Sequence, residues 1–417
     1  MIELSDNASE IIVVLSRLKI IIIKQYGKFS AVLGELSLYS LCLEERCMKL
    51  NPPVWAQSIL VAAIVSISSS VFASADKSED PYVQGFKTYA KEINSYSNIL
   101  TNAANFYADE VISAERKVGY IGEELPLPKA KKIGKDIYAV IGSMIWHTPS
   151  NFGVNNNLGF AIFESGVFVF NAGANPAVAY SLHQQIKRIT DKKVKWVAVE
   201  NNQGHAYLGA SYWSDIGVKN LYSSGMANQQ FHDAFDSIKS EWASRVGQNI
   251  TKTARDVSDK FTTYESELTI DVGGGELVKL IDFGPGHTPA STSLYIPSRN
   301  LLMSGDLGFN ERMPVFFKYT DSFAWTASFA NMMEQVPVGT TILPGHGNAA
   351  DLSVIKKQTY DYLRYMQDSI SKIADVDGTL EQALAVDQSM YKDRPVFDQA
   401  ANNNAQHIYN EITGGEF

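Results

Sequence analysis

The sequence predicts an α/β fold, because strand-like runs and helical stretches alternate from Ile133 onward. Short apolar runs of strand length are separated there by glycine, asparagine and proline turn signals. A helical pattern at Ala177 to Thr190 precedes the apolar run VKWVAV at Val194 to Val199. Glycines 273 to 275 lie between two further strand-like runs and predict a β-hairpin.

Helical patterns lie on both sides of this region and within it. Residues 226–261 form a polar, helix-prone insert, and residues 351–417 look helical to the end. Residues 76–131 form an N-terminal extension with a helical pattern and a proline-containing end, LPLPKAKK. We therefore expect one domain over residues 132–350, with the C-terminal helical segment packed on it.

The N-terminal part has the features of an export signal. Residues 54–73 carry no charge, Met48 and Lys49 precede them, and Ala73-Ser74-Ala75 offers small residues for cleavage. We expect residues 48–75 to be a signal peptide. Residues 1–47 are expected to be an over-called start, that is, residues that precede the true first residue, Met48. In a bacterial host the protein would then be periplasmic or secreted, without a stable membrane span after cleavage. An uncleaved internal signal anchor is the alternative.

Net charge and cysteine positions restrict the kinds of binding partner and the side chains that could bind a metal ion. The net charge of -9, without a Lys/Arg-rich run, argues against a nucleic-acid partner. Both cysteines, Cys42 and Cys47, precede the expected cleavage site. A metal ion in the mature protein would have to be held by His, Asp and Glu.

Four residues with metal-ligating side chains follow glycine in or after apolar runs: His205, His287, Asp306 and His346. Glycine allows close approach of the backbone, and a strand end fixes the direction of a side chain. The shared context predicts that these four residues form one metal site, although a single histidine is more often structural.

The motifs around these residues resemble those of the metallo-β-lactamase superfamily between Ile133 and about Asn348. FGPGHTP, NLLMSGDLGF and ILPGHG are similar to its later metal-binding segments, and VFVFNAGANPAVAYSLHQQI is similar to its early strand, turn and helix. Asn171 stands in that turn where Asp is usual. The resemblance implies a four-layer αββα sandwich with an N-terminal helical extension and C-terminal helices.

The segment VKWVAVENNQGHAYLGA takes the place of the family signature Thr-His-x-His-x-Asp-His-x-x-Gly, with severe departures. Glu200 stands at the first His, Asn202 at the second and Gly204 at the Asp, whereas His205 matches the last His. Of the usual ligands, the first metal site would keep only His287.

The resemblance implies one ion per chain at the second site, held by His205, His346 and Asp306. His287 or Glu200 could serve as a further ligand. We expect Zn²⁺, with Fe²⁺ or Mn²⁺ as alternatives. Asp306 and His205 would be catalytic through the metal-bound water.

Trp146 and His147 are expected on a loop over the pocket, and Asn202 and Gly204 of the signature segment are expected to line the same pocket. The predicted function is that of an exported hydrolase in which metal-activated water attacks an ester, lactam or related bond of a small molecule. A catalytically silent binding protein of the same fold is the alternative. Restoring Asn202→His and Gly204→Asp together is expected to raise the metal count.

Overall fold

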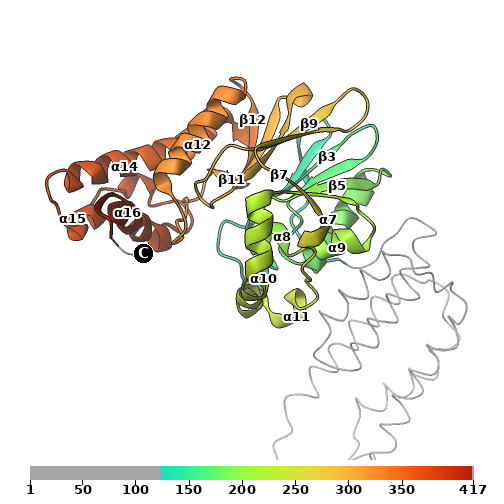
Figure 1. Cartoon of the computed structure of the whole chain (residues 1–417), viewed down its shortest axis with the longest axis horizontal. Coiled ribbons are helices and arrows are strands. Elements are labelled where there is room, and N and C mark those ends of the chain that lie inside the picture. The colour runs from blue at the N-terminus through green and yellow to red at the C-terminus, as the bar shows by residue number, and fades with distance from the viewer. Residues whose placement is uncertain (1–123, 416–417) are drawn as a thin grey trace, which may run out of the picture. The chain divides into compact units, whose positions relative to one another are not determined.

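The computed structural model describes residues 124–415, and it confirms the predicted fold class. Two β-sheets face each other between two layers of helices (Figure 1). The expected signal peptide, the residues before it and the N-terminal extension as far as residue 123 lie outside the described residues.

The first sheet contains seven strands that neighbour one another in chain order. Strands β1 to β4 pair antiparallel, and β4 to β7 pair parallel. The strands are β1 (Lys131–Gly134), β2 (Ile137–Val140), β3 (Leu158–Ile162), β4 (Val167–Phe170), β5 (Val194–Ala198), β6 (Asn220–Ser224) and β7 (Phe261–Tyr264).

The second sheet has the order β13-β12-β11-β10-β9-β8, and only its β11–β12 pair is parallel. The predicted hairpin joins β8 to β9, where three successive glycines have positive φ angles. The strands are β8 (Glu267–Asp271), β9 (Leu277–Asp282), β10 (Thr292–Ile296), β11 (Leu301–Phe309), β12 (Thr341–His346) and β13 (Ala350–Asp351).

Helices cover the outer face of each sheet. The first sheet packs against the helices between β4 and β7, and the second sheet packs against those that follow β11. The helices are α7 (Pro176–Ile189), α8 (Gly204–Tyr207), α9 (Ala210–Asp215), α10 (Gly225–Val246), α11 (Gln248–Thr251), α12 (Ser322–Gln335), α13 (Leu352–Gln358), α14 (Tyr360–Ala374), α15 (Leu380–Leu384) and α16 (Phe397–Thr413). Short 3₁₀ turns are η2 (Pro149–Asn151), η3 (Ser258–Lys260), η4 (Pro297–Arg299) and η5 (Ser389–Tyr391).

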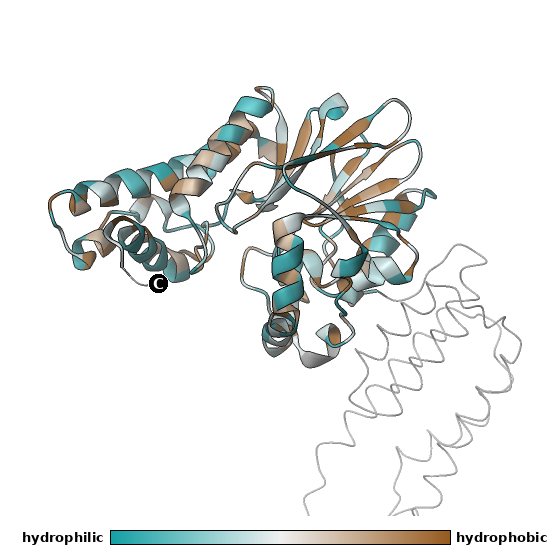
Figure 2. Ribbon diagram, in the orientation of Figure 1, coloured by the Kyte–Doolittle hydropathy of each residue, from teal (hydrophilic) through white to brown (hydrophobic). Residues whose placement is uncertain are grey.

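The alternation of side chains along β4 explains why both faces of the first sheet are apolar. Val167 and Val169 belong to the core beneath the helices, whereas Phe168 and Phe170 belong to the core between the sheets. Successive side chains of a strand point to opposite faces, so a strand covered on both faces reads as a continuous apolar run. Figure 2 shows the resulting brown strands between helices with mixed faces.

The insert and the C-terminal segment flank the two sheets. The insert forms α10, α11 and η3 and then returns to the first sheet as β7. Helices α14 and α16 bury Tyr362, Leu363 and Ile408 in the core that also holds Leu302 of β11. Figure 1 shows these C-terminal helices, in orange to red, beyond α12. Among the described residues, no helix is both long and apolar enough to span a membrane.

Candidate metal centre

Four separate segments bring the predicted ligands together. His205 lies on α8 just after β5, and His287 lies in the loop between β9 and β10. Asp306 lies within β11, and His346 ends β12. All four side chains are buried, so four polar groups lie together in the interior, where polar groups without partners are unfavourable.

The three imidazoles converge on the carboxylate of Asp306. Its Oδ2 lies 3.5 Å from Nε2 of His205 and 3.4 Å from Nε2 of His287, and its Oδ1 lies 3.3 Å from Nε2 of His346. Within the described part of the chain, both carboxylate oxygens and Nε2 of His205 lack hydrogen-bond partners. Buried polar atoms normally have partners, so this donor set fits a divalent cation that is bound by nitrogen and oxygen.

The charge states of these groups also suit metal binding. Burial lowers the pKa of His287 and of His346 to about 4, so both imidazoles are neutral at pH 7 and keep a lone pair for a metal. Burial opposes ionisation of Asp306, but His346 and His287, which become protonated at low pH, outweigh it and hold the pKa of Asp306 below its ordinary value. For His205, burial alone would lower the pKa, whereas the neighbouring carboxylates of Glu200 and Asp306 outweigh it and raise the pKa.

Glu200 lies against the same cluster, and its carboxylate is already engaged. One oxygen each of Glu200 and Asp306 and one ring nitrogen of His205 lie within 4.8 Å of one another. However, Oε1 of Glu200 accepts hydrogen bonds from the side-chain amides of Asn156 and Asn171, each at 2.8 Å, and Oε2 accepts one from the backbone N–H of Asp306. These bonds occupy most of its lone pairs, so Glu200 orients His205 and Asp306 more readily than it ligates a metal.

Two glycines make the close approach of these groups feasible. Gly305 has a φ of +55°, and a side chain there would overlap the carboxylate of Glu200. At Gly345 an added Cβ would overlap the carboxylate of Asp306. The glycines that flanked the candidate ligands in the sequence therefore have a steric cause.

The structure corrects one expectation about the signature loop. A Cβ added at Gly204 would lie 2.5 Å from Cε2 and 2.6 Å from Cδ1 of Trp242, which belongs to α10. Real Cβ atoms do not come that close, so Gly204→Asp cannot restore the missing carboxylate while the indole stays in place. Asn202 lies two residues earlier and lines the cavity described next.

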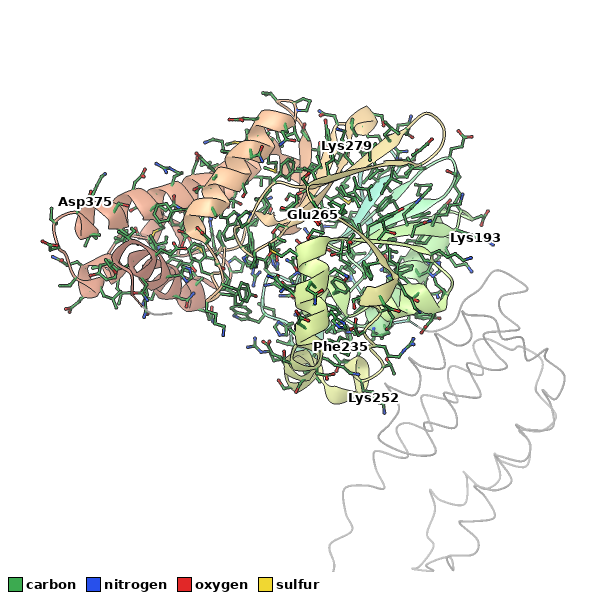
Figure 3. The ribbon with its side chains drawn as sticks, in the orientation of Figure 1. Lys193, Phe235, Lys252, Glu265, Lys279 and Asp375 are labelled. Atoms are coloured by element: carbon green, nitrogen blue, oxygen red, sulfur yellow. The ribbon has the colours of Figure 1, made fainter. Side chains whose placement is uncertain are left out.

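A cavity of about 790 Å³ opens over the cluster. Trp146 and His147 line it, and α10 forms one wall with residues three or four positions apart along the helix. Figure 3 shows Phe235 on this helix. His147 stacks on Trp242 with 4.0 Å between ring centroids, and burial lowers the pKa of His147 to about 3.

Sequence reasoning missed the buried cation of this cavity, Arg312. Its side chain is only 2% exposed, its guanidinium lies 5.6 Å from the ring of Trp146, and its Nε has no hydrogen-bond partner within residues 124–415. Burial lowers the pKa of Arg312 to about 10, so it stays protonated at neutral pH. Nothing in the sequence around Arg312 indicates this burial, because most arginines are exposed.

Gln203 was missed as well. Its Nε2 donates to the hydroxyl of Tyr319 at 2.9 Å and lies 3.4 Å from Nε2 of His287. It therefore joins the signature loop to the loop that follows Arg312.

The fold and the site define an αββα protein with a candidate metal centre between its sheets. Residues 205–346 match the model of the metallo-beta-lactamase superfamily, which confirms the resemblance found in the sequence. Among solved structures, DIM-1 metallo-beta-lactamase is 16% identical with a TM-score of 0.45, covering 58% of this chain and 99% of that chain. A metallo-beta-lactamase from Pontibacter korlensis is 17% identical with a TM-score of 0.45, covering 56% of this chain and 98% of that one.

Proposed function

We propose that this protein is a metal-dependent hydrolase with a single divalent cation, Zn²⁺ in the first instance, bound by His205, Asp306 and His346. The observation that carries the proposal is the convergence of three imidazoles on a buried carboxylate whose two oxygens have no partner in the described residues. His287 is the fourth group within reach, whereas the carboxylate of Glu200 holds the loop in place.

A divalent cation, when bound, would polarise a substrate carbonyl and lower the pKa of water toward about 7. The surrounding residues would position the groups that bind the cation. Asn156 and Asn171 keep Glu200 in place, and Glu200 in turn fixes the backbone of Asp306. The four candidate ligands are themselves buried, and low exposure to water strengthens the electrostatic interactions among them.

We further propose a small-molecule substrate that combines an ester, lactam or related bond with an anionic group. Burial and the neighbouring Asp306 raise the pKa of Glu200. With a divalent cation, the ionised Asp306 and the protonated Arg312, the buried charges sum to +2 when Glu200 is protonated and to +1 when it is ionised. A net positive charge beneath the cavity favours an anion. Arg312 offers such an anion a planar guanidinium with an unused Nε–H.

Two measurements test the proposal on the mature protein. Elemental analysis after purification without added metal should find about one equivalent of a divalent cation, since three or four nitrogen and oxygen ligands suffice for one ion. Hydrolysis of ester and lactam substrates should disappear with a chelator and return with Zn²⁺. Metal binding without hydrolysis of any tested bond would support the binding-protein alternative. The absence of metal under metal-replete conditions would refute the proposed centre.

The role of Arg312 has its own test. Arg312→Met should raise KM for an anionic ester at least about tenfold and leave KM for a neutral ester of similar size unchanged, because charge-assisted hydrogen bonds contribute about 1.5 to 3 kcal/mol. Lys318→Met is the matched control, since Lys318 also lines the cavity but is exposed. Equal effects of the two substitutions would contradict an anion site at Arg312.

We also propose export, with the signal peptide at residues 48–75. The support is the sequence pattern of an uncharged run followed by Ala73-Ser74-Ala75. Its test is the mass of the mature chain.

A further inference from the structure

Trp242 of α10 lies where the family signature would place a carboxylate. The indole is 5% exposed and blocks any side chain at position 204, since an added Cβ there would lie 2.5 Å from its Cε2. It also meets the ring of His205 edge-on, with 6.2 Å between centroids. The same aromatic ring therefore abuts both the altered signature position and a predicted metal ligand.

The indole is held on several sides. His147 stacks on it at 4.0 Å with only 11° between the rings, and a Cβ added at Gly153 would lie 3.1 Å from Cζ3 of Trp242. Helix α10 is itself fixed to α8, because Phe231 stacks on Tyr207 with centroids 3.8 Å apart. These contacts hold the indole of Trp242 against position 204, on the side of the ring that does not face the cavity.

We propose that Trp242 occupies the space that a carboxylate at position 204 would need, and that it thereby determines which side chains can bind the metal. The insert helix removes one oxygen ligand sterically and replaces it with an aromatic wall. Metal binding is then left to His205, His287, Asp306 and His346. This inference rests on the proposed metal centre, and it assigns to Trp242 a positioning and ligand-limiting role.

The proposal makes the effects of changes at positions 204 and 242 interdependent. Gly204→Asp alone should lower the Tm by at least about 3 °C, because overpacking destabilises, and should not tighten metal binding. In the Trp242→Ala background the carboxylate gains space. There, Gly204→Asp should lower the Kd for Zn²⁺ at least about tenfold relative to Trp242→Ala alone, since it adds an anionic ligand.

Gly204→Ala is the matched control. It introduces the steric conflict without a carboxylate, so it should lower the Tm in the unaltered chain and leave the Kd for Zn²⁺ unchanged in the Trp242→Ala background. Trp242→Leu provides a second background if the Ala variant does not fold, because leucine fills part of the space. The measurements are differential scanning calorimetry of the metal-free proteins and Zn²⁺ titration against a competing chelator.

The outcomes separate this proposal from the proposed function. If Gly204→Asp tightens Zn²⁺ binding without any change at Trp242, the indole is not the barrier and the proposal is wrong. Failure of the double variant to gain affinity overturns it as well. If no variant binds metal, the metal centre is refuted. The steric conflict can still be tested in that case, because a change at Gly204 should lower the Tm of the metal-free protein more when Trp242 is present than when it is replaced.

Discussion

Asp306 is the residue whose replacement tests the metal centre most directly. Its carboxylate is the point on which three imidazoles converge, at 3.3 to 3.5 Å, and no other carboxylate of the centre has both oxygens without partners in the described residues. Asp306→Asn keeps the shape of the side chain and removes its charge. Asp306→Ala removes both.

The expected size of the effect follows from the position of Asp306. Loss of a residue that only orients a ligand typically weakens metal binding about 10- to 100-fold. Loss of a direct anionic ligand should therefore weaken binding at least about 100-fold, or by about 2.8 kcal/mol at about 1.4 kcal/mol per tenfold. Asp306→Ala should reduce the metal content after dialysis to near zero.

The metal-free protein should respond much less. In the absence of an ion, the carboxylate is a buried charge with no hydrogen-bond partner in the described residues. Its burial costs free energy, whereas the facing imidazoles favour its ionised form, so in the presence of chelator Asp306→Asn should shift the Tm far less than it does with Zn²⁺. Calorimetry with and without Zn²⁺ separates the two effects.

Asn202→Ala is the control for this experiment. Asn202 lines the same cavity, but its buried Oδ1 forms no hydrogen bond to the described residues. Its replacement should change the Kd for Zn²⁺ by no more than about twofold, because no interaction is lost. If Asp306→Ala binds Zn²⁺ as tightly as Asn202→Ala, the reasoning about the ligand set is refuted.

Three further predictions concern other parts of the chain. Glu200→Gln should weaken Zn²⁺ binding about 10- to 100-fold in a chelator competition, because an amide cannot accept from all three donors that Glu200 now holds. Arg299→Ala should lower the free energy of unfolding by about 3 kcal/mol in urea titrations, because the buried guanidinium binds Glu276 through two nitrogens and also reaches the backbone oxygen of Ile162. Arg299 also lowers the pKa of Glu276 from 4.5 to about 2, so the stabilisation is complete above pH 4.5 and is lost as the pH falls toward 2. Arg299→Ala should abolish this part of the acid sensitivity. Intact-mass measurement of protein from the native compartment should give Asp76 as the first residue, and retention of residues 1–47 would contradict export by a cleaved signal.

The sequence by itself determined the fold class and the group of metal-ligating residues. Alternation of strand-like runs with helical stretches is a local property, and so is the glycine before each of His205, His287 and His346. Why glycine precedes Asp306 and His346 became visible only in the structure, where side chains at Gly305 and Gly345 would overlap the carboxylates of Glu200 and Asp306.

Tertiary structure alone decided which residues surround the ligands. Trp242 is 38 positions from Gly204 along the chain, and its approach depends on how α10 packs on α8. Arg312 appears in the sequence as an ordinary charged residue, and only the loop after β11 buries it in the cavity. Contacts of this kind depend on the relative placement of packed elements, which residue type and local periodicity do not encode. For that reason the sequence could show that position 204 carries no carboxylate, whereas only the structure shows that the indole of Trp242 abuts this position.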